Sequence, residues 1–365
     1  MRDDLKYFLG FSRISGVGAV RFKKICSGFS SMEEAWGAGE AQFREIGLDR
    51  SVIDNIVEER KRIDLEEELQ KLAKEDIYGI TIKDENYPRL LSEIYDPPPI
   101  LYYKGTLEDE RDEYAIGVVG TRKFSPYGKQ VVEDIVSELA RAGISIVSGL
   151  ALGIDTLAHS AALNSDGRTI SVIGGGLDKQ NIYPSSNRYL MDKIVNSGGL
   201  MISEYPPGTM PLKGHFPQRN RIIAGLSVAT LVIEAPERSG ALITSRAAIE
   251  SNRDVLAVPG NIYSTNTAGT NNLIKMGAIC VTSADDVLEV LNLREVSDSV
   301  GKKEIVAEGE TEEKILSVIS SEPVHINELI KQTELDTSTV SSTLVLMEMR
   351  NKIKNLGNQM YVENR

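Results

Sequence analysis

The feature that most restricts the fold of this chain is the alternation of short apolar segments with helical segments after residue 114. The apolar segments are expected to be β-strands, at residues 115–119, 145–148, 169–173, 199–203, 229–233, 254–258 and 278–281. Helices are expected between them at residues 129–142, 154–164, 189–196 and 242–251. Apolar strands separated by helices predict an α/β fold with a doubly wound parallel sheet that is buried on both faces.

The regions before and after this pattern predict further domains. With 365 residues the chain fits two or three domains. Residues 1–72 have helical spacing interrupted by glycines, which predicts a small helical domain, and the sheet domain is expected over residues 73–292. Residues 293–309 are rich in charge and serine, which predicts a linker. Three helical segments and a hairpin around Gly357 predict a winged helix over residues 310–365.

The distribution of charge restricts where nucleic acid can bind. The net charge is −12, which by itself argues against such a partner. However, residues 1–24 carry a balance of +4, residues 113–292 carry 15 basic and 16 acidic side chains, and residues 310–365 carry a balance of −3. Any nucleic-acid contact is therefore expected in the first two of these regions.

Composition also argues against a membrane protein, a secreted protein and a metalloprotein. No apolar run is long enough to span a membrane, and the N-terminus lacks the apolar core of a signal peptide. Cys26 and Cys280 are far apart in sequence and are expected to be reduced thiols in a cytoplasmic protein. The three histidines lack the spacing of metal ligands, and neither a dinucleotide fingerprint nor a P-loop occurs, so no metal or cofactor is expected.

The first motif, residues 117–125, places a glycine turn between a strand and a helix. The carboxyl edge of a parallel sheet is where open α/β folds bind ligands, and free amides at a helix start favour phosphate. Gly120, Thr121, Arg122 and Ser125 are therefore candidate contacts to a nucleic-acid backbone. The alternative is an ordinary glycine turn that carries a surface arginine.

The second motif, residues 148–155, follows the next strand and again leaves backbone amides free. Ser148, Gly149 and Gly153 are its candidate contacts. His159 lies one turn further on and is expected to be buried and hydrogen-bonded. A serine hydrolase is rejected because the nucleophile-elbow pattern requires glycine where Ile146 stands.

The third motif, residues 211–221, interleaves cations with an aromatic ring. Arginine fits phosphate oxygens, asparagine can bind a base edge, and phenylalanine can stack on an unpaired base. In the alternative, Arg219 and Arg221 pair with Glu204 and Glu234 in a structural network. The candidate contacts are Lys213, Phe216, Arg219, Asn220 and Arg221.

A fourth motif, residues 234–244, offers another site for an anion where a helix begins. Ser239 and Gly240 are its candidate contacts, because backbone amides in such a turn point outward. Thr244 and Ser245 have an equally good interpretation as capping or packing residues.

Two further segments have less specific interpretations. Residues 14–22 contain a Gly-x-Gly hairpin followed by cations, which resembles a helix-hairpin-helix that binds phosphates; a helical protein-interaction unit is the alternative. The predicted recognition helix of the winged helix, residues 337–350, has Arg350 as its only cation, against Glu348. Phosphate affinity should therefore be poor, and a protein contact is favoured.

Together these motifs resemble the DNA-processing A (DprA/Smf) family. The resemblance covers residues 1–292, with a looser match in the tail. The blocks that carry it stand in the family's order. They are Tyr87-Pro88-Arg89-Leu90, Asp96-Pro97-Pro98, Val119-Gly120-Thr121-Arg122, Ser148-Gly149-Leu150-Ala151, Gly153-Ile154-Asp155, Glu204-Tyr205-Pro206-Pro207-Gly208, Phe216-Pro217-Gln218-Arg219-Asn220-Arg221 and Val258-Pro259-Gly260.

The resemblance implies a dimeric, extended Rossmann-like protein that binds single-stranded DNA during natural transformation. It also implies loading of the recombinase RecA onto that strand, with displacement of single-strand-binding protein. The positions that match the family's DNA pocket are Arg122, Lys213, Phe216, Arg219 and Asn220. The chain departs from the family at Ser185, where some members carry a lysine; Lys179 is the candidate replacement.

Two other classes of function remain as alternatives. Residues 234–244 distantly resemble the phosphate-binding segment of nucleoside-monophosphate phosphoribohydrolases of the LOG type. The following helix lacks their glutamate, so we expect no enzyme activity. The other alternative is a sequence-specific regulator that binds DNA through its winged helix.

Overall fold

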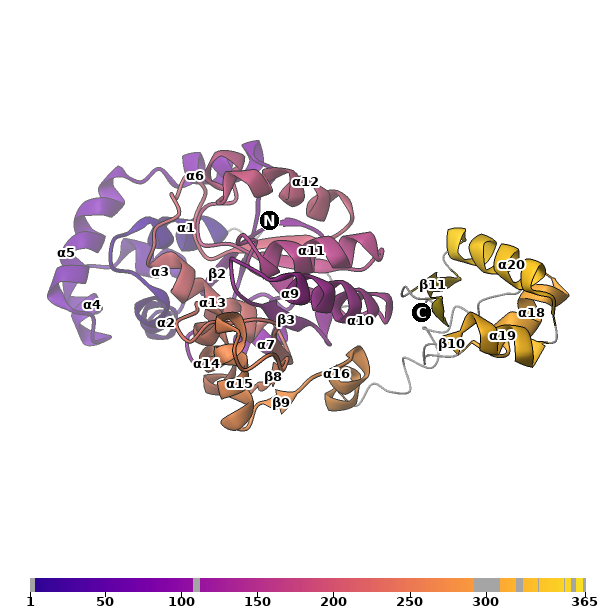
Figure 1. Cartoon of the computed structure of the whole chain (residues 1–365). Helices are drawn as coiled ribbons and strands as arrows, with labels where there is room; N and C mark the ends of the chain where they lie inside the picture. The colour runs from indigo at the N-terminus through magenta and orange to yellow at the C-terminus, as the bar shows by residue number, and fades with distance from the viewer. Residues whose placement is uncertain are drawn as a thin grey trace. The chain divides into compact units, whose positions relative to one another are not determined.

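The computed structural model of the chain describes residues 4–107, 112–291, 309–319, 324–333, 335–350, 352–355 and 359–363. The chain divides into two compact units, residues 1–301 and 302–365. In Figure 1 the first unit is a layered α/β structure and the second, in yellow, contains helices and short strands. The predicted linker over residues 293–309 and the turn at Gly357 lie outside the described residues, apart from residue 309.

The first unit begins with short helices. They are α1 (Leu5–Arg13), α2 (Ala19–Gly28), α3 (Met32–Gly37), α4 (Glu40–Glu45), α5 (Arg50–Glu59), η1 (Arg60–Arg62) and α6 (Leu65–Lys74). Ser31 and Asp64 accept backbone amides of the following turn and so cap α3 and α6. The predicted helical segment at the N-terminus is confirmed.

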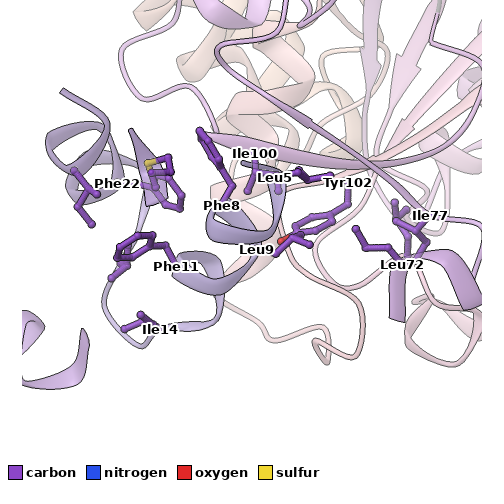
Figure 2. Close-up of a cluster of buried hydrophobic side chains, with 14 of the residues drawn as sticks. Leu5, Phe8, Leu9, Phe11, Ile14, Phe22, Leu72, Ile77, Ile100 and Tyr102 are labelled. Atoms are coloured by element: carbon purple, nitrogen blue, oxygen red, sulfur yellow. The ribbon is translucent and has the colours of Figure 1, made fainter. Parts of the chain in front are cut away.

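These helices share a hydrophobic core with the sheet. Phe8 and Leu9 of α1 lie in one buried cluster with Ile100 and Tyr102 of β2, as Figure 2 shows. The Tyr102 hydroxyl also forms a hydrogen bond of 2.7 Å with Ser12 Oγ. Because this core is continuous, residues 4–74 belong to the first compact unit; the division at residue 72 into separate domains stays a prediction.

The sheet is mostly parallel, as the sequence predicted. Its strands are β1 (Tyr78–Thr81), β2 (Ile100–Gly105), β3 (Ile116–Val119), β4 (Ile146–Ser148), β5 (Thr169–Val172), β6 (Leu200–Ser203), β7 (Ala229–Val232), β8 (Asp254–Ala257) and β9 (Ile279–Cys280). Their order is β1-β2-β6-β5-β4-β3-β7-β8-β9. Only the pairs β1–β2 and β2–β6 are antiparallel. The antiparallel placement of β1 and β2 in this sheet had no sequence signal.

Helices cover both faces of the sheet. One face lies under α9 (Pro126–Val131), the π-helical turn η2 (Val132–Val136), α10 (Ser137–Arg141), α11 (Ile154–Asn164), α12 (Arg188–Asn196) and α16 (Ala284–Val290). The other lies under α7 (Arg89–Ser92), α13 (His215–Gly225), α14 (Ala241–Glu250) and α15 (Ala268–Lys275). In β3, Val118 packs in the first layer and Val119 in the second, which is why its sequence is apolar throughout.

Several elements differ from the sequence-based expectation. The predicted helix over residues 129–142 begins earlier, at Pro126, and contains the π-helical turn. Helices α13 and α15 were not predicted. Short 3-10 turns also occur: η3 (Lys179–Asn181), η4 (Ser185–Asn187) and η5 (Thr265–Thr267).

The second unit is a winged helix, as predicted. It contains α18 (Glu310–Leu316), β10 (Val324–His325), α19 (Ile326–Thr333), α20 (Thr337–Met349), β11 (Ile353–Asn355) and β12 (Met360–Glu363). The strands form a sheet of order β10-β12-β11. Ile315, Leu329, Leu344 and Ile353 form part of a core of its own. None of the helices in the described part of the chain has the length and apolar character of a membrane span.

Candidate functional site

The predicted contact residues gather at one edge of the sheet. Strands β3 to β8 are parallel, so the loops that follow them lie at a single edge, here called the carboxyl edge. Every predicted contact lies at the end of β3, β4, β6 or β7, in the loop that follows, or in the first two turns of the next helix. The chain passes from β3 to β4 on one side and returns to β7 on the other, so β3 and β7 flank the point where open α/β sheets bind ligands.

Arg122, which is exposed, and the half-buried ring of Phe216 form the part of the site that faces solvent. The Arg122 guanidinium carbon lies 5.7 Å from the centroid of the Phe216 ring. Arg122 is exposed and forms no ion pair with any residue that the structure describes. Lys213, in the loop before α13, is exposed as well. Its charge interacts with Asp155 without forming a close ion pair, so the guanidinium over the aromatic face remains available to bind a phosphate.

Tyr183 extends this exposed part. Its ring centroid lies 5.7 Å from that of Phe216, with the planes inclined by 48°. The side chain comes from the loop after β5 and is 52% exposed. We call Arg122, Tyr183, Lys213 and Phe216 the exposed group of the site.

Arg219, in contrast, lies in the interior. Only 4% of the residue is exposed. Its Nη1 donates hydrogen bonds to the carbonyl oxygens of Val172 and Gly149, the latter at 2.6 Å, and its Nε donates to Asn220 Oδ1 at 3.1 Å. Burial lowers the pKa of Arg219 to about 10, so the side chain remains charged at neutral pH. In this arrangement Arg219 joins the ends of β4 and β5 to α13.

A carboxylate of the protein itself takes the place expected for a phosphate in the loop after β4. Asp155 accepts the amide of Gly149 at 3.2 Å and is hydrogen-bonded to the Ala151 amide. Burial raises the pKa of Asp155 to about 6, although Arg219 and the two amides favour its charged form. We call Arg219 and Asp155 the buried pair of the site. A backbone anion site formed by this loop is therefore occupied from within.

The glycines at this edge are required by close packing. Gly153 has φ of +92°, and a Cβ there would lie 2.3 Å from the Thr121 carbonyl oxygen. A Cβ at Gly120 would lie 2.6 Å from Ile154, and one at Gly149 would meet the Arg219 guanidinium at 2.6 Å. These positions keep the loops after β3 and β4 against each other.

Arg221 lies in an ion-pair network, which is the alternative that the sequence left open. Its Nη2 lies 2.7 Å from Glu204 and its Nε lies 2.9 Å from Asp96. The expectation that Glu234 takes part is wrong. Glu234 is buried and instead accepts Ser125 Oγ at 2.5 Å and the Ser125 amide at 2.9 Å.

Two further predicted serines also bind within the protein. Ser148 Oγ is fully buried and donates to the Val118 carbonyl at 2.7 Å. Ser125 caps α9 by accepting the Gly128 amide, in addition to its bonds with Glu234. These hydroxyls position β3, β4 and the loop after β3.

Asn220 connects α13 to the loop after β7. Its Nδ2 donates to the Gly240 carbonyl oxygen at 3.2 Å. The Ser239 hydroxyl accepts the Ala241 amide at 3.3 Å, and Gly240 is exposed with open space around its Cα. Thr244 and Ser245 are buried, which agrees with their interpretation as packing residues.

His159 and Lys179 also have partners within the protein. The His159 ring is buried, and its Nδ1 forms a hydrogen bond of 2.7 Å with Thr169, as expected for a structural histidine. Burial lowers the pKa of His159 to about 3, so the ring is neutral. Lys179, the candidate replacement for the lysine absent at Ser185, forms an ion pair of 2.7 Å with Asp192.

Some basic residues of the N-terminal hairpin and of the winged helix have partners within the protein. Arg21 lies 2.8 Å from Asp49, and Lys24 donates to the Gly47 carbonyl. In the winged helix, Arg350 and Lys352 both contact Glu312. Lys23 in the first segment and Lys331 in the second are exposed and form no ion pair among the described residues, so each segment retains cations.

Sequence reasoning missed two participants in the site. The sequence assigns no role to Tyr183, and it gives Asp155 only as a member of the second motif and of a block shared with the family. Tyr183 lies in the loop that follows a predicted strand. This position could have identified it, because such loops meet at the ligand-binding edge of the sheet. Nothing in the sequence indicated that Asp155 accepts the amides of the neighbouring loop. Within the described residues no His, Cys, Asp or Glu side chains gather as a metal site.

Family models match most of the chain. A model described as DNA recombination-mediator protein A matches residues 79–292, and one described as DprA winged helix domain matches residues 304–359. A curated relative, Protein Smf of Synechocystis sp., is 37% identical over 379 residues, which covers 94% of each chain. The DNA processing protein DprA of Streptococcus pneumoniae is 49% identical over 224 residues, 61% of this chain and 76% of that protein.

Two solved structures are similar in fold and in sequence. The X-ray structure of DNA processing protein A from Streptococcus pneumoniae superimposes with a TM-score of 0.67 at 40% identity, over 78% of this chain and 97% of that one. DNA processing protein A from Helicobacter pylori, described with a single-stranded-DNA binding mode, superimposes with a TM-score of 0.52 at 31% identity, over 59% and 95% of the two chains.

Proposed function

Because the chain belongs to the DNA recombination-mediator protein A family, we propose that it binds single-stranded DNA along the carboxyl edge of its sheet and delivers that strand to the recombinase RecA. The observation that carries this proposal is the exposed guanidinium of Arg122 over the Phe216 ring. Both side chains lie at the carboxyl edge, where the strand order changes direction between β3 and β7. The binding mode described for the Helicobacter pylori relative supports the same class of ligand.

The exposed group supplies both interactions that a single strand needs. Arg122 and Lys213 offer charge to phosphate oxygens, and the rings of Phe216 and Tyr183 offer faces on which bases can stack. Stacking requires unpaired bases, so duplex DNA gains only the phosphate contacts. Preference for single strands follows from this difference.

The contribution of the buried pair is indirect. Arg219 holds the carbonyl ends of β4 and β5, and Asp155 closes the loop after β4. Both residues thereby fix the loop after β4 and the start of α13, which holds Phe216 and Asn220. We assign Arg219, Arg221, Ser125 and Ser148 to positioning rather than to direct contact with DNA. Thr121 also belongs to the positioning residues, because it is 7% exposed and its amide donates to the Glu234 carbonyl at 2.7 Å. Gly120, Asn220, Ser239 and Gly240 remain in the proposed contact surface.

Delivery to RecA is tested on a strand that is already covered by single-strand-binding protein. The chain, acting as a cytoplasmic homodimer, should accelerate the formation of RecA filaments on such a strand, as followed by RecA-dependent ATP hydrolysis. The same assay with Arg122→Ala should show little acceleration. Equal rates with and without the wild-type chain would contradict the delivery step while leaving DNA binding intact.

Catalysis is not part of the proposal. The helix after β7 begins Ala241-Leu242-Ile243-Thr244 and has no carboxylate in its first two turns to cleave a glycosidic bond, and Asp155 is engaged by backbone amides. Incubation with nucleoside monophosphates should release no free base. Release of one or more molecules of base per protein molecule would favour the phosphoribohydrolase alternative.

A further inference from the structure

One loop of the carboxyl edge has no role in the binding surface described above. It follows β8 and comprises residues 258–264. Along this edge the loops follow one another in the order of their strands, which is β6, β5, β4, β3, β7, β8. The proposed contacts end at the loop after β7. The loop after β8 is thus the next one along the same edge, at two strand spacings from β3, or about 10 Å.

This loop presents two apolar side chains to solvent. Ile262 is 79% exposed and Tyr263 is 90% exposed. Large apolar side chains that are exposed side by side are typical of binding surfaces rather than of loops that only connect elements. The neighbouring Phe124 and Tyr127, in and after the loop that follows β3, are 42% and 44% exposed.

Hydrogen bonds hold the loop in place beside Arg122. Asn266 Nδ2 donates to the Lys123 carbonyl oxygen at 2.9 Å, and the Tyr127 hydroxyl donates to the Pro259 carbonyl at 2.7 Å. Asn261 accepts the Tyr263 amide at 2.9 Å through its side chain, which stabilises the turn at the tip. Tyr263 therefore belongs to a turn that is already ordered, and this lowers the entropic cost of ordering the loop when a ligand binds.

The charged side chains between the exposed group and residues 262 and 263 favour the binding of a nucleic-acid strand. Lys123 follows Arg122 directly, is exposed, and forms no ion pair within the described part of the chain. Arg238, in the loop after β7, is also exposed and forms no such pair there. Glu237, which is also exposed, precedes Arg238 in the same loop, so Lys123 supplies the net positive charge there. Single cations between the rings of the exposed group and the side chains of residues 262 and 263 suit an unpaired strand, in which phosphates and bases alternate.

We infer that the DNA-binding surface extends beyond the loop after β7 and that Tyr263 is an additional stacking residue for a base downstream of the one held at Phe216. The inference rests on the proposed function, since it concerns the same strand on the same edge. Lys123 and Arg238 contact the phosphates between the two stacked bases. Ile262 contacts the sugar or base beside Tyr263.

The length of the oligonucleotide distinguishes this extension from the pocket at Phe216. An oligothymidylate of about 2 nucleotides fills only the pocket at Phe216, because one or two further nucleotides already span the distance of about 10 Å to the loop after β8, whereas a strand of about 20 nucleotides covers the whole surface. Tyr263→Ala should weaken binding of the long strand by about fivefold or more and leave the short strand nearly unchanged. Tyr263→Phe should restore the long-strand affinity, because the ring face is retained.

A matched control is available at the opposite edge of the sheet. Tyr114, 42% exposed, precedes β3 and therefore lies at its amino end. Tyr114→Ala should not change the affinity for either strand. If Tyr263→Ala binds the long strand as tightly as wild type while Arg122→Ala binds it more weakly, the extension is wrong and the proposed function stands.

Two other outcomes overturn the inference for different reasons. If wild type binds neither strand, the proposed function and its extension fall together. If Tyr263→Ala changes the molar mass in solution, measured by light scattering at the concentrations of the titration, the exposed loop serves a protein contact instead. Loss of long-strand affinity at unchanged mass is the supporting result.

Discussion

Arg122 and Arg219 belong to the same edge of the same sheet, yet they occupy opposite environments. Arg122 is exposed over the ring of Phe216 and forms no close ion pair among the described residues, although its charge acts on Asp155. Arg219 is buried, and its guanidinium binds two backbone carbonyls beside Asp155. The comparison teaches that a cation near a nucleic-acid site can serve either the ligand or the scaffold, and that exposure and existing partners decide which.

The largest expected effect lies in the buried pair. Arg219→Ala would leave the carbonyl oxygens of Gly149 and Val172 without this donor and the Asp155 carboxylate without the cation that most favours its charged form. We expect a loss of about 3–5 kcal/mol in the free energy of unfolding, measured by urea denaturation. Arg122→Ala is the control and should change this quantity by no more than about 0.5 kcal/mol. Equal stability of the two variants would remove the distinction between the residues.

Phe216 should show the largest loss of affinity within the exposed group. Phe216→Ala removes the face on which a base stacks and the support of the Arg122 guanidinium. Affinity for oligothymidylate should fall by about 1–3 kcal/mol in a fluorescence-polarisation titration. Affinity for a duplex of the same length should change less, because paired bases do not reach the ring. An equal loss on both ligands would show that the ring serves the scaffold.

Arg122 should act through charge. Arg122→Ala should weaken binding regardless of sequence and reduce the slope of log affinity against log salt by about 0.7 for one lost phosphate contact. Arg122→Lys should keep the slope but lose part of the affinity, since an ammonium cannot lie flat on the Phe216 ring. An unchanged slope and affinity in the alanine variant would exclude this residue from the site.

The smallest effect is expected from the winged helix. Its core is separate, and its cations Arg350 and Lys352 contact Glu312. Removal of residues 303–365 should therefore change single-strand affinity by less than about 0.5 kcal/mol, which is the scatter found for independent sites. Abolished binding would favour a regulator that binds DNA through this unit.

The sequence predicted the sheet and the edge because both depend on local patterns. Apolar strands between helices indicate a parallel sheet, and parallel strands bring the loops after β3, β4, β6 and β7 together. The sequence did not reveal the antiparallel β2 beside β6, since its partner is remote in the chain. The closeness of Arg122 and Phe216 likewise depends on the order of the strands.

The burial of Arg219 has a local signal, but only once α13 is recognised. Arg219, Ile222, Ile223 and Leu226 recur at helical spacing, and all four are buried. The segment was interpreted as a motif of cations rather than as a helix, because Pro217 and the polar residues near its start obscure the apolar face. Asp155 had no such signal, since its partners come from the loop that precedes its own helix.

The central claim is that a few exposed cations and rings at the carboxyl edge bind unpaired DNA. The most direct test is a titration of the wild-type chain with oligothymidylate and with a duplex of equal length, at two salt concentrations. We expect tighter binding of the single strand and an affinity that falls with salt by a slope of about −1.4 for the contacts of Arg122 and Lys213, and of about −2.8 if Lys123 and Arg238 contact the strand as well. No binding of oligothymidylate in dilute buffer, or tighter binding of the duplex, would contradict the account.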